Sequence, residues 1–130
     1  MLSMSNINKS FWNTIKYFKK DEFDCKCGCG LNYVDKNSVS RLDTARILAG
    51  VPFVLNSACR CIAHNKKVKG SETSSHLKGF AFDIAVDNTS HRFIILTSLL
   101  KVGFKRIGIY KNFIHVDGDL TKSQNVIWYK

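Results

Sequence analysis

The chain has 130 residues, of which 45% are hydrophobic, a size that supports one core and therefore a single domain. Its formal net charge of +10 makes a polyanion an expected partner, whether nucleic acid, an anionic membrane or an acidic cell-wall polymer. The lysines are spread along the chain rather than clustered, which disfavours a DNA-reading helix. No run of about eighteen apolar residues is present, so we expect no membrane insertion.

The first twenty residues, MLSMSNINKSFWNTIKYFKK, contain scattered Asn, Lys and Ser residues. They lack the continuous apolar segment and the small-residue cleavage site of a secretory signal. We therefore expect no signal peptide.

The hydrophobic pattern predicts an α+β fold, in which helices pack on a central antiparallel sheet. Helices are expected at residues 11–18, 38–49 and 90–102. Strands are expected at residues 53–58, 80–86, 106–110, 113–117 and 125–129, the last as an edge strand. Lys111 and Asn112 form the turn of a hairpin. A polar loop is expected between Ala63 and Ser75.

Five cysteines form two groups, with Cys25, Cys27 and Cys29 in CKCGC and Cys59 and Cys61 in CRC. The odd number excludes a complete set of intrachain disulfides, and one residue between cysteines is short for a zinc knuckle. We expect free, partly buried thiols in a reducing cytosol, which brace the fold and perform no chemistry. A disulfide between the groups or a small thiolate site stays open as an alternative.

An aspartate, Asp83, stands inside the otherwise apolar run FAFDIAV, where a charge is costly unless a partner neutralises it. His76 lies seven residues earlier, and a turn between them can bring its imidazole to the carboxylate. His115 and Asp117 are two residues apart on a predicted strand, so they share one face. Two histidines and one carboxylate, with a fourth position open to water, are the ligands of a hydrolytic zinc site. We therefore expect zinc at His76, Asp83 and His115.

Each of these residues also has an ordinary structural explanation. His76, in a Ser-rich loop, could be exposed to solvent. Asp83 could be satisfied by backbone amides or by Arg60, and His115 could be a partly buried strand residue with hydrogen-bonded ring nitrogens. The spacing alone leaves these alternatives open.

The sequence around these positions resembles the zinc D-alanyl-D-alanine carboxypeptidase family, which includes phage and bacterial peptidoglycan endopeptidases. The pattern S-x-H-x-x-G-x-A-x-D is similar to the segment with Ser74, His76, Gly79, Ala81 and Asp83. An upstream pattern, S-x-x-R-x-x-x-H-N, is matched by Ser57, Arg60, His64 and Asn65. The later pattern G-I-Y-x-x-F-x-H-x-D is matched by Gly108, Ile109, Tyr110, Phe113, His115 and Asp117. The opening FKKDEFDCKCGCG also resembles the N-terminal segment of small members.

The resemblance implies one zinc ion per chain, held by the ligands His76, Asp83 and His115. It also implies that Arg60 binds the substrate's carboxylate or polarised carbonyl, for which a planar, permanently charged guanidinium is suited. A surface cation beside two cysteines is the alternative for Arg60. Ser74 or Ser75 would either bind substrate or cap the loop.

The chain departs from the family at the general base. Several members have a glutamate three residues before the last histidine, where this chain has Asn112. Because an amide cannot take a proton, Asp117 is the expected base, as the H-x-D variant of the family suggests. Its alternative is a turn residue before Gly118 that bonds its own backbone.

The resemblance implies a zinc metallopeptidase that hydrolyses an amide bond in peptidoglycan stem peptides, as a D,D-carboxypeptidase or an endolysin-like endopeptidase. We expect one domain over residues 1–130, with a cysteine-containing segment at 1–35 and the metal and catalytic core at 53–117. The expected protein is a monomer without a specific nucleic-acid partner. Without a signal peptide, it would be cytoplasmic in the producing cell or phage-associated, and would act on the cell wall after release.

Two other functions stay open. One is a catalytically inactive, zinc-holding binding module on the same fold. The other is a basic nucleic-acid-binding protein that uses CKCGC as a metal knuckle.

Overall fold

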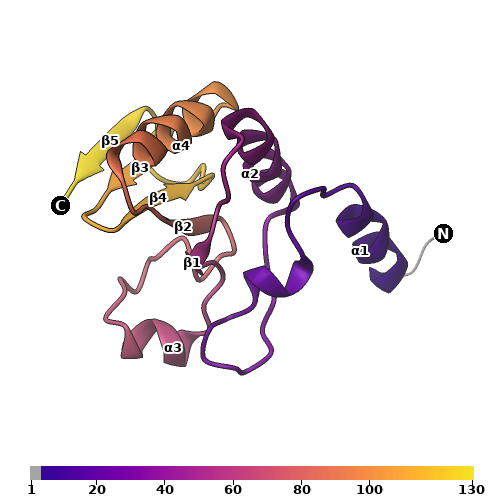
Figure 1. The fold of residues 1–130 in the computed structure, drawn as a ribbon. Helices are drawn as coiled ribbons and strands as arrows, with labels where there is room; N and C mark the ends of the chain where they lie inside the picture. Colours follow the sequence, from indigo (N-terminus) through magenta and orange to yellow (C-terminus); the bar gives the residue numbers. More distant parts are fainter. Residues whose placement is uncertain (1–3) are drawn as a thin grey trace.

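The computed structural model describes residues 4–130, which form four α-helices, one 3-10 helix (η1, Lys20–Phe23) and five strands (Figure 1). The α-helices are α1 (Met4–Asn13), α2 (Lys36–Ala49), α3 (Ile62–Lys67) and α4 (Thr89–Lys101). The strands are β1 (Leu55–Ser57), β2 (Ala81–Ala85), β3 (Arg106–Ile109), β4 (Phe113–Asp117) and β5 (Val126–Tyr129). Residues 1–3, at the start of the segment for which we expect no signal peptide, lie outside the described residues. Among the described residues, every helix is too short or too polar to cross a membrane.

The five strands form one open sheet in the order β1-β2-β4-β3-β5. β2 is antiparallel to both β1 and β4, and β4 is antiparallel to β3. The predicted hairpin joins β3 to β4, with Ile109 opposite Ile114. The α+β fold with a central antiparallel sheet is therefore confirmed. β5 lies at the edge of the sheet and pairs with β3 in parallel. After β4 the chain passes the end of β3 and then turns back, so β5 runs in the same direction as β3.

Helices α2 and α4 lie side by side on one face of the sheet (Figure 1). The core lies between these helices and the sheet, and its fully buried side chains include Leu42, Ile84, Leu99 and Ile114. Helix α2 begins two residues before the predicted start, since the Asp35 carboxylate accepts a hydrogen bond from the Ser38 amide as an N-cap. The opposite face of the sheet is left free for polar side chains.

The helix expected at residues 11–18 is wrong in its bounds, because α1 ends at Asn13. The amides of Lys16 and Tyr17 instead donate to the two oxygens of the Asp43 carboxylate, both at 2.9 Å. This contact with α2 replaces the next turn of helix. Phe18, one of the apolar residues assigned to that helix, is buried nonetheless.

The polar loop expected between Ala63 and Ser75 is also corrected, because its first part is the short helix α3. The Cys61 sulfur caps this helix by accepting a hydrogen bond from the His64 amide at 3.3 Å. Cysteine is an unusual N-cap, so the sequence carried no ordinary signal for the start of α3.

Candidate metal centre

Alternation along β2 and β4 separates the core face of the sheet from a polar face. Ile84 and Ile114 point into the core and are fully buried. Asp83 and His115 therefore point to the opposite face, where they stand directly across from each other in the ladder. The alternation that we predicted for β4 is confirmed.

His76 reaches the same polar face from the loop that precedes β2. Its Nε2 lies 3.2 Å from Asp83 Oδ1, and His115 Nδ1 lies 2.9 Å from that same oxygen. His76 and Asp83 are buried, and His115 is half-buried. The structure thus brings together the three side chains that we expected as metal ligands, within 4.8 Å of one another.

Hydrogen bonds on the far side of each ring determine which nitrogen faces the cluster. His76 Nδ1 lies 2.6 Å from the Ala58 carbonyl oxygen, so this nitrogen carries a proton and Nε2 is the nitrogen that faces Asp83. His115 Nε2–H donates to Asp117 Oδ2 at 2.8 Å, so Nδ1 is the nitrogen that faces Asp83. Such outer partners are typical of metal-binding histidines.

This arrangement fits zinc. With a metal ion bound, the two nitrogens that face Asp83 would offer their lone pairs to the ion together with the carboxylate oxygen. Donor atoms held at about 2.0–2.2 Å in a tetrahedron lie roughly 3.3–3.6 Å apart. The observed separations of 3.2 and 2.9 Å are somewhat shorter, so the three side chains would move apart by a few tenths of an ångström around an ion.

The charges of the cluster support the same interpretation. Burial raises the pKa of Asp83, but hydrogen bonds from His115 and His76 outweigh it, and the pKa lies well below its usual range. Burial lowers the pKa of His115, yet hydrogen bonds to Asp117 and Asp83 bring it above its usual value. Asp83 is therefore ionised near neutral pH and, without a metal, favours a proton on His115, which a cation can replace.

Arg60 lies beside the cluster and is mostly buried, with a side-chain exposure of 13%. Its Nε–H donates to Ser57 Oγ at 3.1 Å, and Nη1 donates to Asn65 Oδ1 at 3.2 Å. Nη2 lies 3.5 Å from Asp83 Oδ2. Burial lowers the pKa of Arg60 below its usual value, although the charge of Asp83 partly opposes this shift. A guanidinium stays charged in this setting. These contacts disfavour the surface-cation alternative.

Asp117 has both carboxylate oxygens occupied and is 1% exposed. Oδ2 accepts the bond from His115, and Oδ1 accepts from Arg106 Nε at 2.8 Å and from the Asp119 amide at 3.1 Å. Burial raises the pKa of Asp117, but the bond from His115 and the charges around it bring it below the usual range. These contacts favour a residue that orients His115, rather than the general base that we expected.

The two serines before His76 have the contacts of the loop-capping alternative. Ser74 Oγ accepts a hydrogen bond from the His76 amide at 3.2 Å. Ser75 is buried, and its hydroxyl donates to Asp119 Oδ2 at 2.7 Å. Both side chains therefore stabilise the loop that carries His76.

Sequence reasoning missed Trp128 on β5. Its ring centroid lies 5.5 Å from that of His115, and a Cβ atom on Gly108 would lie 2.6 Å from the indole. Gly108 stands opposite both His115 and Trp128 in the ladder, so the missing side chain lets the indole approach the cluster. The alternation of side chains along β3 was the available signal, but it indicates the close approach of Trp128 only once the strands that flank β3 are known.

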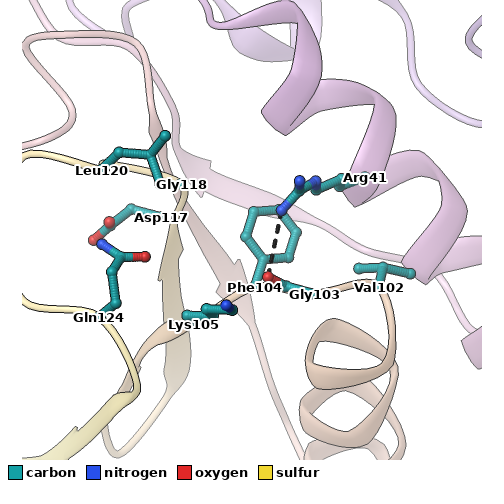
Figure 2. Close-up of a pocket in the computed structure, with 9 residues that line it drawn as sticks. All are labelled: Arg41, Val102, Gly103, Phe104, Lys105, Asp117, Gly118, Leu120 and Gln124. Carbon is teal, nitrogen blue, oxygen red and sulfur yellow. Dashed lines mark hydrogen bonds between the residues drawn. The ribbon is translucent and has the colours of Figure 1, made fainter.

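A cavity of about 360 Å³ is lined by Asp117, the hydrogen-bond partner of His115 (Figure 2). Arg41 and Val102 line one side and Asp117 and Gln124 the other, and Arg41 Nη1 donates to the Gly103 carbonyl at 3.3 Å. His76, Asp83 and His115 are absent from its lining. We therefore assign no reaction to this cavity.

Residues 16–117 match the protein family described as peptidase M15. The chain belongs to the peptidase M15 family. This confirms the resemblance seen in the motifs, and the family is one of zinc-dependent peptidases. The matched range includes all three residues of the cluster, whereas β5 with Trp128 lies beyond it. No curated protein shows a significant match to the sequence.

Proposed function

We propose that this protein is a zinc metallopeptidase that hydrolyses an amide bond in peptidoglycan stem peptides. The observation that carries the proposal is the convergence of His76 Nε2 and His115 Nδ1 on Asp83 Oδ1, at 3.2 and 2.9 Å, in a peptidase M15 chain. Three protein ligands leave the fourth position of a tetrahedral site for water or substrate, as in catalytic rather than structural zinc sites.

In this proposal His76, Asp83 and His115 hold the metal ion. When bound, zinc supplies a Lewis acid that polarises a carbonyl group and activates water. The Ala58 carbonyl and the Asp117 carboxylate keep each ring in the tautomer that binds metal. Asp117 is therefore a positioning residue.

Arg60 is the proposed contact for a negative charge on the substrate. Ser57 and Asn65 hold two of its nitrogens, and Nη2 lies beside Asp83 at the edge of the cluster. A guanidinium fixed in this way can bind a stem-peptide carboxylate or stabilise the oxyanion that develops on the scissile carbonyl. Its fixed orientation reduces the entropy lost on binding.

The peptidoglycan substrate is supported by the family and by charge. Stem peptides carry carboxylates, and many cell walls contain anionic polymers. A protein with a net charge of +10 is attracted to both at modest ionic strength. We propose that the protein acts on the cell wall after release from the cell that makes it.

The test is digestion of purified peptidoglycan by the zinc-loaded protein, with mass spectrometry of the released fragments. We expect products in which one amide bond has gained the elements of water, and their masses identify the bond. The variant His115→Ala, which removes one metal ligand, is the control and should release no fragments. Binding to peptidoglycan without any hydrolysis would contradict the proposal and favour the inactive binding module.

A further inference from the structure

Four of the five cysteines form a group that shares no residue with the His/Asp cluster. The sulfur atoms of Cys25, Cys27, Cys29 and Cys61 all lie within 4.8 Å of one another. Cys25 Sγ lies 3.5 Å from Cys27 Sγ, which lies 3.7 Å from Cys61 Sγ. Both separations exceed a disulfide bond of about 2.05 Å, and all four thiols are free.

These separations are those expected of a metal site. Sulfur atoms that bind zinc at about 2.3 Å in a tetrahedron lie roughly 3.8 Å apart. Four thiolates and no open position are the ligand set of a structural zinc site, and soft sulfur ligands select zinc over magnesium or calcium.

Two glycines overcome the short spacing that we took as an argument against a metal knuckle. Gly28 and Gly30 both have φ of +85°, in the left-handed region that L side chains rarely adopt. The Cys25 amide donates to the Leu31 carbonyl at 2.8 Å and closes the turn. The chain therefore curls, and successive cysteines point to a common centre instead of alternating sides.

Backbone amides also point at the sulfur atoms. The Cys61 amide donates to Cys25 Sγ at 3.4 Å, and the Leu31 amide donates to Cys29 Sγ at 3.5 Å. Such bonds favour the ionised sulfur that binds metal.

The fifth cysteine is of a different kind. Cys59 is buried, and its thiol donates to the carbonyl oxygens of Phe23 at 3.1 Å and Leu31 at 3.3 Å. Burial raises the pKa of Cys59, so the sulfur keeps its proton. The odd number of cysteines is therefore explained as four ligands and one structural thiol.

We propose that Cys25, Cys27, Cys29 and Cys61 bind a structural zinc ion, distinct from the ion of the His/Asp cluster. The site joins the N-terminal segment to the chain around Arg60, the residue before Cys61. The Arg60 amide donates to the His76 carbonyl at 3.1 Å. The ion thus anchors the segment from which Arg60 and the loop of His76 extend.

The test is metal analysis of the full chain, purified without oxidation, together with cobalt substitution. We expect about two zinc ions per wild-type chain and about one in Cys27→Ser. The variant His115→Ala should also hold about one, at the four cysteines. Cobalt bound to His115→Ala should show the intense sulfur-to-cobalt charge-transfer band of thiolate ligation. This band reports on the four-cysteine site alone, so it distinguishes failure of this inference from failure of the proposed function.

Cys59→Ser is the matched control, because it removes a thiol outside the four and keeps a hydrogen-bond donor. It should retain both the zinc content and the charge-transfer band. Cys27 is exposed, so Cys27→Ser is expected to fold. Unchanged zinc content and an unchanged band in Cys27→Ser would overturn the proposal.

A thiol-reactive dye provides a second measurement on the wild-type protein. We expect slow labelling of Cys27 and Cys29, although both are exposed, until a chelator is added. Fast labelling of both before chelation would contradict a bound ion.

Discussion

Asp83 is tolerated inside an apolar strand because side chains from three distant segments surround it. His76, Arg60 and His115 contribute contacts between 2.9 and 3.5 Å. These contacts satisfy a charge that burial alone would make costly. The sequence predicted the two histidines through their motifs and faces, and Arg60 through its family pattern.

At Asp117, the contacts predict a loss of metal affinity when the charge is removed. In Asp117→Asn the amide offers a single acceptor oxygen to His115 and Arg106, which both donate to the carboxylate in the wild type. The tautomer of His115 is then less firmly held, and we expect zinc affinity to fall roughly 10- to 100-fold. Competition with a chromophoric chelator measures this change.

Unchanged zinc affinity with a large loss of turnover would instead restore Asp117 as the general base. Glu72→Gln tests a second candidate base, since Glu72 is an exposed carboxylate on the loop before His76. If Glu72 is the base, its variant should keep zinc and lose turnover by roughly a hundredfold or more.

Arg60→Lys separates substrate binding from metal binding. An ammonium group cannot hold Ser57, Asn65 and a substrate carboxylate at once with the geometry of a guanidinium. We expect zinc content to stay unchanged and kcat/KM on peptidoglycan fragments to fall roughly 10- to 100-fold, the value of a charge-assisted hydrogen bond. Unchanged kcat/KM would remove Arg60 from the proposed substrate contacts.

At the scale of elements, local patterns predicted α2, α4 and the five strands, but they missed α3 and the bounds of α1. The hairpin around Lys111 and Asn112 and the faces of β4 followed from alternation. The parallel pairing of β5 did not, because alternation is the same for either strand direction. The end of α1 depends on Asp43, 27 residues beyond Lys16 in the chain, which a local pattern cannot contain.

The cysteine cluster was left as an alternative to free thiols for a related reason. A spacing rule for zinc knuckles assumes an ordinary turn, whereas Gly28 and Gly30 place the chain in the left-handed region. The fourth sulfur, on Cys61, comes from a segment more than thirty residues away, since Cys27 and Cys61 are 34 residues apart.

The loop that carries His76 depends on Gly79. Its φ is +78°, and a Cβ atom there would lie 2.4 Å from the Tyr33 carbonyl oxygen. Gly50 is the matched control, since its φ is +67° and its Cβ would meet no atom within 4 Å. Gly50→Ala should lower the free energy of unfolding by about 1–2 kcal/mol, the cost of the left-handed conformation.

Gly79→Ala should cost clearly more than Gly50→Ala, because a backbone clash is added to the conformational cost. Chemical denaturation of both variants measures the difference. Equal losses in the two variants would show that the loop moves away from Tyr33 without cost, and that Gly79 does not fix the position of His76.

In the whole molecule, one sheet face packs against the core and the other carries the His/Asp cluster. Helices α2 and α4 cover the first face (Figure 1). The second face gathers Asp83 from β2, His115 from β4 and Trp128 from β5. The division of the chain into a cysteine-containing segment at 1–35 and a catalytic core at 53–117 stays a prediction. The proposed four-cysteine site would link these two parts, because three of its ligands lie in the first part and Cys61 lies in the second.

Metal reconstitution tests the central claim, that the His/Asp cluster holds the ion on which hydrolysis depends. The wild-type chain and Asp83→Asn are stripped of metal with a chelator, and peptidoglycan hydrolysis is measured as zinc is added back. We expect the activity of the wild type to return as zinc is added and to saturate when its metal sites are filled. We expect Asp83→Asn to stay inactive even when its four-cysteine site holds as much zinc as that of the wild type. Full hydrolysis by the stripped wild type, or recovery of Asp83→Asn to the wild-type rate, would contradict the account.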